Sequence, residues 1–84
     1  MRIVSRDDRD YEGWSNWVTW NVALWIDNTE RWYTTVRKGR PYTAREIRAL
    51  VKHLMPHGTA DMREDGETYA HVDWQELADH FNAS

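Results

Sequence analysis

The stretch from residue 13 to residue 28 reads GWSNWVTWNVALWIDN and holds four of the six tryptophans of the chain. Asn16 is suited to cap a helix, because its side-chain oxygen accepts a backbone N–H of the first turn, and Asn28 is a natural stop. At about 100° per residue the apolar side chains cover most of a helix surface, whereas they show no alternation with a period of two. The stretch therefore predicts a central helix that is either buried on most sides or keeps a tryptophan surface for a partner.

The same residues resemble a family of short uncharacterised proteins that are common in bacteriophages and other mobile elements. In that family the signature G-W-x-N-(Y/W)-x-T-W-x-V-x-L-W-(I/L)-x-N opens the chain, and residues 13–28 match it at every fixed position. A weaker similarity follows at Val72-Asp73-Trp74 and Leu77-Ala78. The resemblance implies a mobile-element origin and a domain of its own, and no activity or catalytic residue is carried over from it.

The length of 84 residues indicates one domain. Six tryptophans, four tyrosines and one phenylalanine supply its core, since each aromatic ring buries about 150–250 Å². Because there is no cysteine, a reducing cytoplasm is the expected location. The charged N-terminus argues against a signal peptide, and the longest apolar run, 22–26, is too short to span a bilayer. We therefore expect a cytoplasmic protein without a membrane partner.

Residues 1–12 end in a charged run and are predicted to form an N-terminal arm, which leaves 13–84 as a single helical domain. A second helix is predicted over 29–38. Gly39 after it is expected to take the left-handed conformation that ends many helices, and Pro41 prevents continuation.

The third helix is predicted over 43–55. Thr43 and Glu46 have the spacing of a capping box, and Tyr42 and Ile47 that of a hydrophobic staple. The apolar residues repeat at i, i+3, i+4, i+7 and i+8, which forms one face of a helix. These residues are Ile47, Leu50, Val51, Leu54 and Met55.

The last helix is expected to open at Asp73, with Glu76 completing a further capping box. Between 58 and 72 we expect a long ordered loop that carries Tyr69 and Val72 inward, with a helical turn near 60–63. The predicted fold is therefore all-α, a small four-helix bundle around the central tryptophan-rich helix with one long loop before the last helix.

Charge is divided between two parts of the chain, although the net charge is only −3. Residues 31–52 hold seven basic and one acidic residue, and residues 61–79 hold seven acidic residues and one arginine. The basic part includes a stripe on the third helix, opposite its apolar face. With the preceding helix and turn it resembles a helix-turn-helix in outline, whose recognition helix needs such a stripe for phosphates and base edges. The residues of this alternative nucleic-acid site are Arg37, Lys38, Arg40, Arg45, Arg48 and Lys52.

Simpler interpretations of the stripe are a solvated helix face, or pairing with the acidic part of the chain. The tryptophans have a simple interpretation too, as core residues, but six of them cannot all be buried in so small a body. Trp14, Trp25 and Trp32 are the predicted exposed anchors for a partner. Stacking on single-stranded bases is disfavoured because basic residues do not interleave with the tryptophans along the sequence. The predicted electrostatic rim of the partner site is Asp61, Glu64, Asp65 and Glu67, which could also be a solvated loop.

Catalytic and ligand-binding groups are few. His53 and His57 are four residues apart, but Pro56 breaks the helix that would align them on a metal. The chain has no glycine-rich phosphate loop and no nucleotide fingerprint. We therefore predict no catalytic, cofactor-binding or metal-binding residue, and expect a protein that is not an enzyme.

The expected function is binding of a host protein or protein–nucleic-acid complex by a small protein of mobile-element origin. In its sharper form it inhibits a host defence nuclease complex, as anti-CRISPR or anti-restriction proteins do. The alternative is a small DNA-binding regulator that uses the helix-turn-helix-like basic helix 43–55. A third possibility is a homodimer in which the apolar circumference of the first helix faces a second copy.

Overall fold

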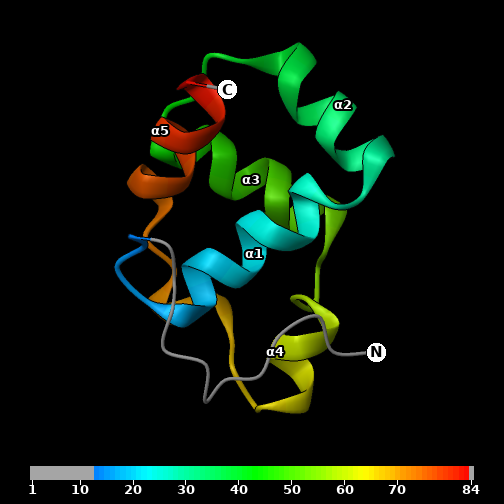
Figure 1. The fold of residues 1–84 in the computed structure, drawn as a ribbon, viewed down its shortest axis with the longest axis vertical. Helices are drawn as coiled ribbons and strands as arrows, with labels where there is room; N and C mark the ends of the chain where they lie inside the picture. The colour runs from blue at the N-terminus through cyan, green and yellow to red at the C-terminus, as the bar shows by residue number, and fades with distance from the viewer. Residues whose placement is uncertain (1–12, 84) are drawn as a thin grey trace.

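A computed structural model of the protein describes residues 13–83, so the predicted N-terminal arm at 1–12 lies outside the described residues. Figure 1 shows α1 in the middle of the molecule, with α2 and α4 toward opposite ends. No strand occurs between residues 13 and 83, which confirms the predicted all-α class. None of the helices in that range combines the length and apolar character that a membrane span requires. The elements are α1 (Trp17–Asp27), α2 (Glu30–Gly39), α3 (Ala44–Leu54), α4 (Ala60–Glu64), the 3-10 helix η1 (Tyr69–His71) and α5 (Trp74–Ala83).

The helix α1 is covered by its neighbours on most of its surface. It contacts α2, α4, η1 and α5, and eight of its 11 residues are buried. Trp17 and Trp20 are core residues, 5% and 6% exposed. The apolar circumference that the homodimer possibility would place against a second copy is therefore largely covered within the monomer.

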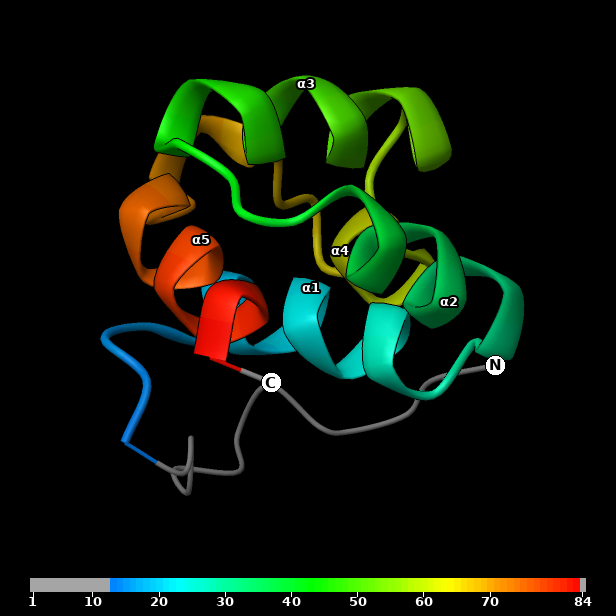
Figure 2. The same cartoon turned by 90° about the horizontal axis from the view of Figure 1, so that it is seen from above.

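The helix α3 packs chiefly against α5, and Figure 2 shows α3 along one edge of the molecule. Ile47 and Val51 of α3 are fully buried, as are Leu77 and Phe81 of α5. Ile47 and Val51 belong to the apolar face that the helical spacing predicts for α3. Each such side chain contributes roughly 1.5–3 kcal/mol before conformational entropy is subtracted.

Side-chain caps fix where the helices begin. Asn16 Oδ1 accepts the Thr19 amide at 2.9 Å, which confirms the predicted start of α1. Thr43 and Glu46 form the predicted capping box at the start of α3. Asp73 Oδ1 accepts the Glu76 amide at 3.0 Å. The reciprocal bond from Glu76 that we expected is replaced, because the Asp73 amide donates to Thr19 Oγ1 instead.

The predicted count of four helices is one short, and the four-helix-bundle arrangement is not confirmed. Residues 60–64 form α4, capped by Thr59, where we expected only a turn within a long loop. Residues 69–71 form η1, capped by Thr68. The long loop is therefore divided by two short helical segments, each held by a threonine hydroxyl that accepts a backbone amide.

The expected left-handed conformation of Gly39 is wrong, because Gly39 is the last residue of α2 and does not have a positive φ. The absence of a side chain at Gly39 leaves room for a neighbouring ring. A Cβ on Gly39 would collide with the Tyr42 hydroxyl, which donates to the Val36 carbonyl at 2.7 Å. The chain leaves α2 through Arg40 in extended conformation.

Candidate functional site

The three predicted tryptophan anchors are half-buried rather than exposed, and each packs against the core. The Trp14 ring lies edge-on to His80 of α5, with 5.0 Å between ring centroids. Trp25 Nε1 donates to Asp61 of α4 at 3.0 Å. The structure therefore places these two indoles against different helices and does not bring them into one patch.

Asp61 does not belong to an exposed acidic rim, because it is fully buried. Its Oδ2 accepts Asn21 Nδ2 at 2.9 Å as well as Trp25 Nε1. Thr59 Oγ1 donates to Asn21 Oδ1 at 2.6 Å, which completes a polar network between α1 and α4. A buried carboxylate is stable only when it is hydrogen-bonded, so its partners explain why an acid was drawn into the core. The other predicted rim residues are Glu64, which is exposed, and Asp65 and Glu67, which are half-buried.

The basic stripe is exposed as predicted. Arg45, Arg48 and Lys52 all lie on the outer face of α3. Among residues 13–83 no carboxylate is within ion-pair distance of these three, so the acidic part of the chain does not neutralise them there.

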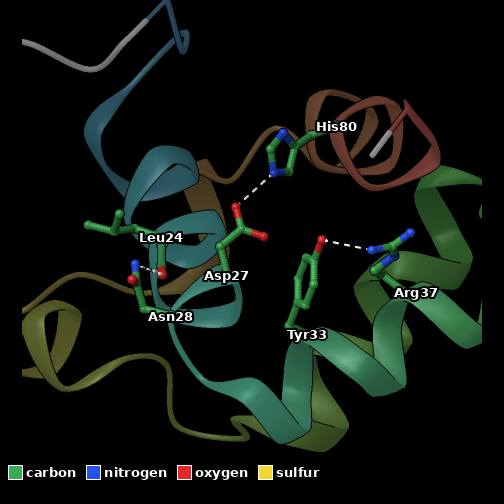
Figure 3. Close-up of polar contacts among 6 residues, drawn as sticks. All are labelled: Leu24, Asp27, Asn28, Tyr33, Arg37 and His80. Carbon is green, nitrogen blue, oxygen red and sulfur yellow. Dashed lines mark hydrogen bonds and ion pairs between the residues drawn. The ribbon is translucent and has the colours of Figure 1, made fainter.

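The three basic residues predicted as nucleic-acid contacts on and after α2 do not share one environment, unlike the basic stripe of α3. Arg37 Nη1 donates to the Tyr33 hydroxyl at 3.2 Å, and Figure 3 shows this pair on α2. Lys38 is exposed. Arg40 is half-buried, and its Nη1 is buried without a hydrogen-bond partner among the residues that the structure describes. Arg40 is therefore not presented as a surface phosphate contact.

The contacts of the two helices do not favour the expected helix-turn-helix, because α2 packs chiefly on α1 and α5, and α3 packs chiefly on α5. The turn between them is fastened to α5 instead. The Tyr42 amide donates to Asn82 Oδ1 at 2.7 Å, and Asn82 Nδ2 donates to the Tyr42 carbonyl at 2.9 Å.

A cavity of about 460 Å³ lies between α3, η1 and α5, and we call it the α3–α5 cavity. Two cations of the basic stripe and two aromatic rings line it together. The rings are those of Tyr69 and Trp74, with centroids 5.5 Å apart and planes tilted by 48°. This combination cannot be recognised from sequence spacing, because Trp74 lies far along the chain from the basic helix. The lining residues are Arg48, Lys52, Pro56, Thr68, Tyr69, Ala70 and Trp74.

The aromatic wall of the α3–α5 cavity is held in place by hydrogen bonds. Thr68 Oγ1 accepts the Ala70 amide at 3.2 Å and so fixes η1, which carries Tyr69. The Tyr69 hydroxyl donates to the Met55 carbonyl. Burial raises the pKa of Tyr69 to about 12, so the hydroxyl keeps its proton and remains a donor at neutral pH. Trp74 is the first residue of α5 and follows directly after the cap at Asp73.

A histidine–carboxylate pair lies elsewhere, between α5 and α1. His80 Nε2 is 2.9 Å from Asp27 Oδ2, as Figure 3 shows. Such a pair serves nucleophilic catalysis only beside an activated nucleophile. The Ser15 hydroxyl donates to Glu76 at 2.8 Å, so it is not oriented by the histidine. Among residues 13–83 no group of histidines and acids is arranged to hold a metal ion.

Comparison with known families gives a match over residues 7–82, nearly the whole chain. The chain belongs to the family of unknown function DUF7249. Neither a curated protein nor a solved structure matches it. The family description assigns no activity to a DUF7249 protein, so its function has to be inferred from the geometry of its surface.

Two features of the DUF7249 domain have the chemistry of a binding site. The exposed cations on α3 have the charge that a phosphate ligand would require, and the α3–α5 cavity beside them adds aromatic rings on which a flat group could stack. A guanidinium and an ammonium next to indole and phenol rings are the combination found where nucleic-acid strands are bound without base pairing.

Proposed function

We propose that this protein binds nucleic acid through the exposed basic face of α3. The observation that carries the proposal is the row of Arg45, Arg48 and Lys52 beside an aromatic cavity. The proposal keeps the predicted basic helix and abandons the helix-turn-helix. Because α3 packs chiefly on α5, the contact is made by one helix face and the cavity next to it, rather than by the second helix of a helix-turn-helix.

The spacing of the three cations suits a phosphate backbone. Residues 45 and 52 are seven positions apart, which is about 10 Å along a helix axis. Successive phosphates of one strand in a duplex are about 3.4 Å apart along the axis, so the row spans several phosphates. The overall charge of −3 does not oppose this, since screening limits the reach of distant acids to about 8–10 Å at physiological salt.

The test is binding of fluorescein-labelled single-stranded and duplex oligonucleotides, followed by anisotropy over a range of salt concentrations. Replacing Arg45, Arg48 and Lys52 by glutamine should reduce the slope of log affinity against log salt by about 2 for single strands, at about 0.7 per contact. Arg31→Gln is the matched control for one charge, because Arg31 is exposed on α2. Absence of binding at low salt, or an unchanged slope in the triple variant, would refute the proposal.

A second candidate function is protein binding, favoured by the surroundings of Trp14. This indole lines a shallow cavity of about 370 Å³ together with the carboxylates of Glu76 and Asp79. An aromatic face beside two acids fits an arginine or lysine side chain of a partner. The partner would be a host protein or protein–nucleic-acid complex, with inhibition of a host defence nuclease as the sharper form. The resemblance to mobile-element proteins supports that form, as does a cysteine-free composition suited to the cytoplasm.

The second candidate is tested by retention of a purified nuclease complex from the host on immobilised protein. Trp14→Ala should abolish retention, and Trp32→Ala should leave it unchanged. Equal retention by both variants, or none by the wild-type protein, would count against it. Sedimentation over a range of concentrations separates both functions from a homodimer, whose apparent mass would rise with concentration.

A further inference from the structure

We infer that the α3–α5 cavity holds one unpaired base of a single-stranded nucleic acid, with the adjoining phosphate on Arg48 and Lys52. The inference rests on the proposed function and narrows its ligand from nucleic acid in general to an unpaired strand. Base stacking was disfavoured because basic residues and tryptophans do not interleave along the sequence. The fold nevertheless brings Arg48 and Lys52 together with Tyr69 and Trp74 in one cavity.

The cavity has room for such a ligand. Its volume of about 460 Å³ falls within the range of roughly 300–1,000 Å³ typical of small-molecule sites. A separate cavity of about 160 Å³ shares Pro56, Thr68 and Tyr69 with it but is also lined by Glu67, so the inferred nucleotide site is confined to the α3–α5 cavity. A base within a duplex is covered on both faces by its neighbours in the stack and cannot enter without being flipped out, at a cost of a few kcal/mol.

The aromatic end of the cavity is organised before the ligand arrives. The Tyr69 ring is fixed by its bond to the Met55 carbonyl, and Trp74 is half-buried against the core. The tilt of 48° between the two rings leaves a wedge-shaped wall rather than a closed stack. Because these side chains are already ordered, little conformational entropy is lost when a base packs against them.

Two cations of α3 line the same cavity as these rings. Arg48 and Lys52 are four residues apart on α3 and therefore project from the same face. No acidic residue lines the cavity, so within it a phosphate meets two positive charges and no carboxylate. Thr68 adds a hydroxyl to the same wall. A ligand with a flat ring at one end and a phosphate at the other satisfies both ends, and one nucleotide of an unpaired strand has that form.

The experiment compares labelled oligothymidylate, labelled oligouridylate and a duplex of equal length by anisotropy at low salt. The single strands should bind at least about tenfold more tightly than the duplex. Trp74→Leu should weaken single-strand binding between about 5-fold and about 150-fold, as expected for the loss of one stacked base. Trp32→Leu is the matched control and should change it less than twofold. Both DNA and RNA supply the inferred chemistry, so tight binding of either strand supports the inference, and the tighter one identifies the sugar.

Two further measurements keep the test independent of the folding of the Trp74 variant. Arg48→Gln should weaken single-strand binding about tenfold more than Arg31→Gln does. In the wild-type protein, titration with oligothymidylate should shift the Trp74 indole N–H resonance more than that of Trp32. Duplex binding as tight as single-strand binding, or no effect at Trp74 in variant and spectrum, overturns the inference but leaves phosphate binding by α3 in place. Absence of all binding overturns both.

Discussion

Replacing Asp61 by alanine should destabilise the protein more than any surface substitution of the same charge. Asp61 is fully buried, and its Oδ2 accepts both Asn21 Nδ2 and Trp25 Nε1. Without the carboxylate, the buried Asn21 amide and the part-buried Trp25 indole lose this acceptor, at about 1–3 kcal/mol each. The expected loss is therefore about 2–6 kcal/mol. A chain of 84 residues has a total stability of about 4–13 kcal/mol at roughly 0.05–0.15 kcal/mol per residue.

Urea denaturation followed by tryptophan fluorescence measures this loss. With a slope of about 1 kcal/mol per M for a small domain, the midpoint should fall by at least about 2 M. Asp79→Ala is the matched control, because Asp79 is exposed and accepts one hydrogen bond from Gln75 at 2.9 Å. The free energy of unfolding of the Asp79→Ala variant should fall by less than about 1 kcal/mol. If Asp61→Ala changes stability no more than this control does, the network does not hold α4 on α1 and the reasoning is refuted.

Three other substitutions test the remaining contacts. Gly39→Ala should lower the free energy of unfolding by about 1–3 kcal/mol in urea denaturation, because the new Cβ would collide with the Tyr42 hydroxyl. Equal stability of the variant would show that the turn adapts. Asn82→Ala removes two bonds to the Tyr42 backbone, so stability should fall by about 1–2 kcal/mol and amide exchange at Tyr42 should accelerate; unchanged exchange would contradict this. Burial raises the pKa of Tyr69 from 10.0 to about 12, so its stabilising effect is complete below pH 10 and is lost as the pH rises toward 12. Tyr69→Phe should remove that part of the pH dependence of unfolding, and an identical pH profile in the variant would refute the assignment.

Local signals in the sequence predicted most of the helices. The helix caps at Asn16 and Thr43 each join residues that are three positions apart. Such caps can therefore be predicted from local sequence spacing alone. The short helix α4 was expected only as a turn because its five residues present no complete apolar face. Gly39 was assigned the wrong role because a collision with Tyr42 depends on how the following turn folds back.

The candidate site was less predictable, because it depends on contacts between distant parts of the chain. The acidity of Asp61 suggested the surface, whereas two donors from α1 hold it in the core. The positive charge of Arg48 was recognised, but its proximity to Trp74 arises only when α5 packs on α3. The spacing of residues in a sequence indicates which side chains share one helix face. It does not indicate which faces of different helices meet, and a cavity between helices depends on that.

The polar residues of α5 and its cap bind segments between residues 15 and 42, which lie far from them in the sequence. Glu76 accepts the Ser15 hydroxyl, the Asp73 amide donates to Thr19, and Asn82 binds Tyr42. These contacts close long loops. Closing a long loop costs more conformational entropy than forming one helix, so such contacts form late and slowly in folding. The α3–α5 cavity should accordingly form and be lost together with the domain, rather than open by fraying of one edge. A nucleotide strand seated there would then raise the melting temperature of every helix at once.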